Sequence, residues 1–154
     1  FKSISMRHQL PIVVGNSGKA RSTGEQVAKV RKLFEEQRDF VAHLAKNAGE
    51  LSTKAVDAIR DGDLRTLGEL IISNHEILRK VGVSTQDLDH LVEVSMKAGA
   101  FGAKLTGAGG GGCIIALTEK DAQQAVAEAI EGSGGKAYIV EMDKFGVRAW
   151  LKEM

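Results

Sequence analysis

A run of glycines, Gly107 to Gly112, is the segment whose residues could do chemistry most directly, and only Ala108 interrupts it. Glycine readily adopts positive φ and lets a backbone come close to another group. Successive N–H groups in such a loop can form a concavity that binds an anion, and phosphate is the expected guest. The same run also suits a hairpin connection packed tightly against another element, so the glycines alone leave both interpretations open.

The common nucleotide-binding patterns do not account for this run. It matches G-x-G-x-x-G formally, but a dinucleotide site needs a helix directly after the glycines, whereas the apolar residues 113–117 predict a buried strand. Glu128 and Glu131 fall where that site needs an acidic residue at a strand end, but they lie on a predicted helix. The sequence contains no Gly-Lys-Ser/Thr, and neither the His-Arg-Asp nor the Asp-Phe-Gly signature of protein kinases.

The elements that must position this loop alternate between strands and helices. Strands are predicted at residues 10–14, 103–106, 113–117 and 136–142, with one more at 147–151. Helices are predicted across 23–98 and again after Thr118. The resulting order predicts an α+β fold, a ferredoxin-like split βαβ sheet with extra helices inserted in the first crossover.

Capping residues divide the helical block. Predicted helix starts are Thr23, paired with Gln26 in a capping box, then Asp63, Ser84 and Thr118. Predicted helix ends are Gly49, Gly62 and Gly82. On the helix after Asp63, the apolar stripe includes Asn74, whereas His75 is expected to lie off it.

Composition bounds the class of protein. The 154 residues suit one domain, and 43% of them are hydrophobic. Lys plus Arg number 21 against 20 Asp plus Glu, which argues against a nucleic-acid or membrane surface. The single cysteine, Cys113, excludes an internal disulfide and is typical of the cytoplasm. The longest apolar run is too short to span a bilayer.

Three segments together resemble a known family. The string from Lys104 to Cys113, Lys-Leu-Thr-Gly-Ala-Gly-Gly-Gly-Gly-Cys, is similar to the third motif of the GHMP kinases, in the form that their mevalonate kinase branch carries. Residues 74–78 with 82–84, and residues 15–18 with 21–23, resemble that family's flanking segments. The resemblance covers residues 12–138. It departs at Asn16, where many relatives have Asp, although either residue suits a turn.

The resemblance implies a kinase of two domains, of which residues 1–154 would be the C-terminal one. The family's N-terminal domain carries the loop around the ATP phosphates, the acidic residue and the lysine that promote attack by the substrate hydroxyl, and the side chains for Mg²⁺. None of those motifs occurs here, so we expect no catalytic residue and no metal ligand in this chain, with ATP and Mg²⁺ as cofactors of the whole enzyme. The chain also starts at Phe1 without an initiator Met, and we expect a missing segment upstream.

Within the resemblance, individual residues acquire expected roles. Phosphate binding is assigned to Gly107, Ala108, Gly109 and Gly110. Substrate binding is assigned to Thr23 and Arg21, because arginine suits a carboxylate and a helix N-terminus attracts anions.

The partners follow from the same resemblance. Mevalonate is the expected acceptor, and another acceptor such as phosphomevalonate or homoserine is the alternative. A non-catalytic ferredoxin-like domain that binds a metabolite is the third possibility. We expect the missing N-terminal domain as the main partner, with a homodimer as an option, because a half-enzyme would expose the apolar face of its cleft.

Overall fold

The structure is a computed structural model that describes residues 9–143 and 146. The strand predicted at 147–151 lies outside the described residues. Four strands form one antiparallel sheet in the order β2-β3-β1-β4. They are β1 (Ile12–Asn16), β2 (Gly102–Leu105), β3 (Cys113–Leu117) and β4 (Lys136–Val140). This order, with each crossover skipping one strand, confirms the predicted ferredoxin-like fold.

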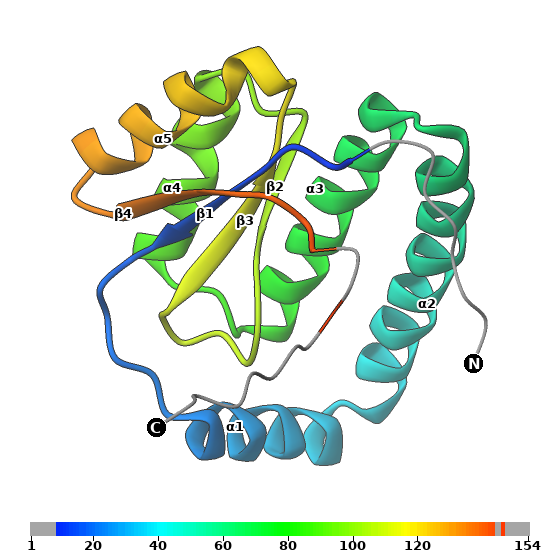
Figure 1. The fold of residues 1–154 in the computed structure, drawn as a ribbon. Coiled ribbons are helices and arrows are strands. Elements are labelled where there is room, and N and C mark those ends of the chain that lie inside the picture. The colour runs from blue at the N-terminus through cyan, green and yellow to red at the C-terminus, as the bar shows by residue number, and fades with distance from the viewer. Residues whose placement is uncertain (1–8, 144–145, 147–154) are drawn as a thin grey trace, which may run out of the picture.

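Two helices, α4 (Gln86–Lys97) and α5 (Gln123–Gly132), cover one face of the sheet (Figure 1). The main core lies between this helical layer and the alternate strand residues that point toward it. Val13, Ile114 and Ile130 are fully buried there. Before α5, the chain makes the short 3₁₀ turn Lys120–Ala122.

The inserted helices are α1 (Thr23–Glu36), α2 (Arg38–Asp61) and α3 (Leu64–Val81). The predicted break at Gly49 is wrong, because α2 continues through it and the chain bends at Gln37 instead. Gly49 is exposed, and a glycine in an exposed helix interior costs only about 1 kcal/mol relative to alanine. The long helix α2 therefore tolerates it.

The helix caps agree with the sequence in part. Asp63 caps α3 through the Thr66 N–H at 2.9 Å, and Gly62 and Gly82 end their helices in the left-handed conformation, all as predicted. The other predicted caps are displaced. Ser22, not Thr23, caps α1; Thr85, not Ser84, caps α4; and Thr118 is buried, with its hydroxyl 3.4 Å from the Pro11 carbonyl.

Helix α3 is buried on two sides, because it packs against both α2 and the edge strand β2. Its apolar stripe joins Ala58 of α2 in a second small core. The side toward β2 is formed by Gly68 and His75, which lie two helical turns apart. A Cβ at Gly68 or Gly102 would overlap the backbone of the facing element, so these two glycines allow the helix to approach the strand.

His75 lies off this apolar stripe, as predicted, but it is still buried and only 3% exposed. The apolar stripe marks the side of α3 that faces α2. The second buried side consists of a glycine and a histidine, so hydrophobic periodicity cannot reveal it.

Candidate functional site

The glycine loop connects β2 to β3 and is held from two directions. On one side, the Gly110 N–H donates to the Val83 carbonyl at 2.8 Å, in the turn between α3 and α4. On the other, the Gly112 N–H donates to the Lys19 carbonyl at 3.2 Å, in the segment between β1 and α1. The Thr106 N–H donates to the Cys113 carbonyl at 2.9 Å and closes the base of the loop.

Gly109 is the position where glycine is most strictly required. Its φ is +81°, and a Cβ there would overlap the Val83 carbonyl. Any side chain would therefore add backbone strain and push the loop off the turn that holds it.

The structure brings Arg21 to this loop. Its Nη1 donates to the Thr106 carbonyl at 3.3 Å, and the guanidinium lies over the loop so closely that a Cβ at Gly107 would fall 2.6 Å from Nη1. Arg21 itself is exposed, so its remaining N–H groups face solvent beside the glycines. A positive charge thus lies where the sequence predicts a phosphate.

Thr23 lies two residues further on, as the exposed first residue of α1. Among the described residues, no hydrogen bond joins its side chain to the loop. Because Ser22 caps the helix through the Glu25 N–H at 3.3 Å, the Thr23 hydroxyl is not needed for capping. Its predicted substrate role stays a prediction.

The four residues assigned to phosphate binding differ in the state of their backbone donors. The Gly110 N–H is engaged with Val83, so its contribution is to fix the loop and not to donate to an anion. In the described part of the chain, the N–H groups of Gly107, Ala108 and Gly109 have no internal acceptor. These three donors and the Arg21 guanidinium are therefore available to an anion such as phosphate.

Lys104 lies on the opposite side of β2 from the main core. It is half-buried and lines a pocket of about 160 Å³ between α2, α3 and β2, together with Asn74. Burial lowers the pKa of its amine below the ordinary 10.5. The Lys104 side chain therefore lines a mainly apolar pocket beside the strand that leads into the loop.

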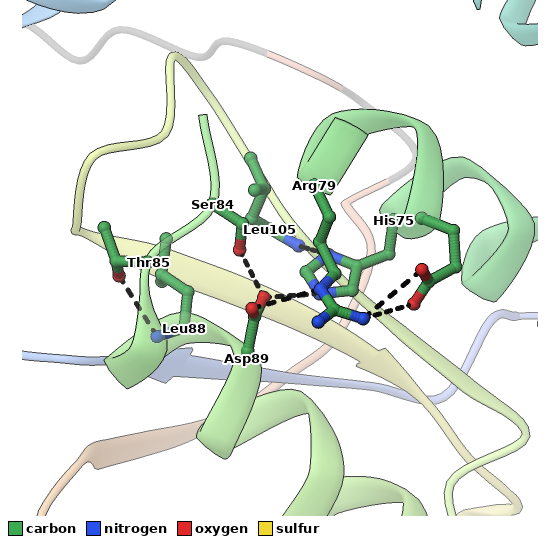
Figure 2. Close-up of polar contacts among 8 residues, drawn as sticks. His75, Arg79, Ser84, Thr85, Leu88, Asp89 and Leu105 are labelled. Atoms are coloured by element: carbon green, nitrogen blue, oxygen red, sulfur yellow. Dashed lines mark hydrogen bonds and ion pairs between the residues drawn. The ribbon is translucent and has the colours of Figure 1, made fainter. Parts of the chain in front are cut away.

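A polar network that the sequence did not predict joins α3, the turn after it, α4 and the end of β2 (Figure 2). His75 Nε2 is 3.1 Å from Asp89 Oδ1, and the Leu105 N–H lies 3.4 Å from His75 Nδ1. The Ser84 hydroxyl donates to Asp89 Oδ1 at 2.5 Å, and Arg79 Nε donates to Asp89 Oδ2 at 3.1 Å. Arg79 also contacts Glu76 at 3.0 Å.

Burial is the main influence on the imidazole of this network. It lowers the pKa of His75 below 6.5, and the Asp89 carboxylate opposes this shift only in part. His75 is therefore neutral at neutral pH. Within residues 9–143 and 146, no group of three or more acidic, histidine or cysteine side chains could hold a metal ion, and no helix is long and apolar enough to cross a membrane.

Comparison with known proteins identifies the family. Residues 55–136, more than half of the chain, match the family model described as GHMP kinases C terminal. The chain therefore belongs to the GHMP kinase C-terminal domain family.

Its curated relatives include mevalonate kinases of several Thermococcus and Pyrococcus species. The chain is 43% identical over 145 residues to "Mevalonate kinase" of Thermococcus sibiricus and 45% identical over the same length to that of Pyrococcus horikoshii. Each alignment covers 91% of this chain and 43% of the relative. The chain thus spans less than half the length of these relatives.

The fold comparison agrees. The crystal structure of L. major mevalonate kinase in complex with R-mevalonate superposes with a TM-score of 0.82 at 32% identity, over 85% of this chain and 40% of that one.

Proposed function

We infer that residues 1–154 form the C-terminal domain of an ATP-dependent kinase that transfers the γ-phosphoryl group to the primary hydroxyl of mevalonate, giving ADP and 5-phosphomevalonate. The observation that carries this proposal is the glycine loop with free N–H groups and the Arg21 guanidinium beside it. Identity above 40% to mevalonate kinases supports the choice of acceptor.

The loop suits phosphoryl transfer because that reaction depends on positioning and charge neutralisation more than on covalent chemistry. Gly107, Ala108 and Gly109 offer preorganised donors, and donors of this kind are worth about 3 kcal/mol each in a transition state. Bound Mg-ATP would supply the phosphoryl group and neutralise part of its charge. This chain holds and orients that group, whereas the acidic residue and the lysine that promote attack by the hydroxyl, and the Mg²⁺ ligands, belong to the rest of the polypeptide.

The acceptor is assigned to the start of α1. Arg21 lies against the loop, where the phosphoryl group and the acceptor hydroxyl must meet, and arginine pairs well with a carboxylate such as that of mevalonate. Thr23 lies at the helix N-terminus, where the partial positive charge of the helix favours an anion. Both residues are exposed, as a binding role requires.

The main partner is the remainder of the same polypeptide. Helix α1 buries none of its residues, although Val27 and Phe34 are apolar and are 52% and 41% exposed. On β4, Tyr138 and Val140 are also exposed. Since the chain spans 43% of its relatives, an N-terminal domain would have ample length to cover these surfaces. We place the enzyme in the cytoplasm, where the unpaired Cys113 stays reduced.

The test is ADP release by the complete reading frame with Mg-ATP and a panel of mevalonate, phosphomevalonate and homoserine. The proposal predicts turnover with mevalonate and none with the other two. Turnover with phosphomevalonate or homoserine instead would move the protein to another branch of the family. A folded complete protein that turns over none of them would favour a domain that binds a metabolite without catalysis.

A further inference from the structure

We propose that His75 is a positioning residue that holds the glycine loop in its working conformation, through the strand that enters the loop and through the turn that supports its middle. The inference rests on the proposed function, in that the loop is taken to bind the transferred phosphate. It concerns a buried side chain of α3 that contacts neither the phosphate nor the acceptor.

The first link runs from His75 to the start of the loop. Its Nδ1 lies 3.4 Å from the N–H of Leu105, the last residue of β2 and two residues before Gly107. A backbone N–H can only donate, so Nδ1 must be the unprotonated acceptor nitrogen. Because β2 is an edge strand, this N–H faces α3 and not another strand. His75 therefore completes the hydrogen bonding of the strand at the point where the loop begins.

The second link runs through Asp89. With Nδ1 unprotonated, Nε2 carries the proton of the neutral ring and donates to Asp89 Oδ1 at 3.1 Å. The same carboxylate oxygen accepts the Ser84 hydroxyl at 2.5 Å (Figure 2). Ser84 follows Val83, whose carbonyl accepts the Gly110 N–H and lies against Gly109. The network therefore fixes the turn on which the middle of the loop rests.

The two links make the conformation of the loop depend on one ring. Leu105 sets where the loop starts, and Val83 sets where its middle lies. A protein structure that only needed to fill this space could use an apolar side chain, whereas a buried imidazole with both nitrogens engaged specifies one orientation. Misplacing a reacting group by about 1 Å can reduce a rate by about 100-fold, so small loop shifts would be visible in kinetics.

Several charged groups surround the imidazole. From α4 these are Asp89, His90 and Glu93, and from α3 they are Glu76 and Arg79, all of which line the same cavity as His75. From β2 the ring faces the Leu105 N–H. A second proton on the ring would have to go to Nδ1, where it would face another donor and break the bond to β2. Acid should therefore weaken the first link, provided that Asp89 stays ionised.

The experiment uses the complete protein and three variants. His75→Leu removes both links, and His75→Asn keeps an acceptor near the position of Nδ1 but does not titrate. Ser95→Ala is the matched control, because Ser95 is a fully buried serine of α4 whose hydroxyl donates only to the Leu91 carbonyl. The readouts are kcat and KM for each substrate, and hydrogen exchange at the Leu105 and Gly110 amides.

The proposal predicts that His75→Leu lowers kcat by roughly 10–100-fold with little change in the KM for the acceptor. It also predicts faster exchange at both amides. Relative to His75→Leu, His75→Asn should restore protection of the Leu105 amide and part of kcat. Its kcat should also lack the decline at acid pH that protonation of the His75 ring causes in the parent protein. Ser95→Ala should leave kcat and both amides unchanged.

Unchanged kcat and unchanged exchange in a folded His75→Leu protein would overturn the proposal. If that variant does not fold, Ser84→Ala provides the test, since it should speed hydrogen exchange at the Gly110 amide and leave the Leu105 amide unchanged. Exchange at the parental rate at both amides would reject the second link. The exchange readout needs no turnover. A parent protein without kinase activity would therefore refute the proposed function and still leave the His75 network testable.

Discussion

His75 shows how a single buried side chain can carry a pH dependence. The pKa of His75 is lower in the folded chain than in the unfolded chain, because burial holds the folded value below 6.5. Above pH 6.5 the ring is neutral in both states, and its contribution to stability is complete. As pH falls below 6.5, the unfolded chain takes up a proton that the folded chain resists, so the unfolded state gains stability.

We therefore expect the free energy of unfolding to fall as pH drops below 6.5 and to level off below the folded pKa of His75. His75→Asn should flatten this part of the curve. The measurement is urea unfolding of both proteins between pH 5 and 8, and it rests on the lowered pKa of the buried His75 imidazole. Parallel curves for the two proteins would contradict the assignment of the pH dependence to this residue.

At the scale of the residue, the sequence identified the loop but not what holds it. The glycines and Arg21 could be predicted because their types carry a chemical meaning. The structure adds that Arg21 contacts the loop across 85 positions of sequence, and that the Gly110 N–H is used internally. Asp89 and Ser84 could not be predicted, because a charged or hydroxyl residue near a helix start is ordinarily a solvated or capping residue.

The start of α1 bears on the two roles that the sequence analysis assigned to Thr23, helix capping and substrate binding. Ser22 accepts the Glu25 N–H and caps the helix, so the Thr23 hydroxyl has no capping role. A lost Ser cap typically costs about 1 kcal/mol of stability.

We expect Ser22→Ala to lower stability by about 1 kcal/mol with little change in the KM for mevalonate. Thr23→Ala should do the reverse, raising that KM by roughly 10-fold, the equivalent of one modest hydrogen bond of about 1.4 kcal/mol, at nearly unchanged stability. Thermal unfolding and steady-state kinetics of the complete protein make the comparison. A Thr23→Ala protein with parental KM would remove Thr23 from the substrate site.

The elements themselves were predicted well where local signals act alone. Strand 113–117 and the ends of α2 and α3 at Gly62 and Gly82 follow from apolar runs and left-handed glycines. The break at Gln37 was missed because glutamine is an ordinary helix former and makes no side-chain capping bond here, so it gives no local signal. The two-sided burial of α3 was missed for a similar reason, since glycine and histidine give no apolar periodicity.

At the scale of the whole molecule, the described residues form a four-stranded sheet with one well-covered face and several exposed apolar side chains. Val27 and Phe34 on α1, Phe40 on α2 and Tyr138 on β4 are each more than 40% exposed. Exposed apolar surface of this kind favours association. These side chains are open to solvent in the 154-residue chain.

We therefore expect the isolated 154-residue chain to self-associate as its concentration rises. Sedimentation velocity over a wide concentration range is the measurement. Phe34→Lys should reduce the association, while Lys46→Ala, an exposed change on α2 away from these apolar residues, should not. A clean monomer at every concentration would show that these surfaces need no partner.

The central claim is that this chain positions the phosphoryl group for transfer to mevalonate, and the most direct test compares two glycines in the complete protein. Gly109→Ala would strain a residue at φ +81° and drive a Cβ into the Val83 carbonyl, whereas Gly49→Ala meets no atom within 4 Å. We predict mevalonate-dependent ADP release at the parental rate from Gly49→Ala, and a loss of roughly 100-fold or more from Gly109→Ala. No mevalonate-dependent release from the parent protein, or full activity of a folded Gly109→Ala, would contradict the account.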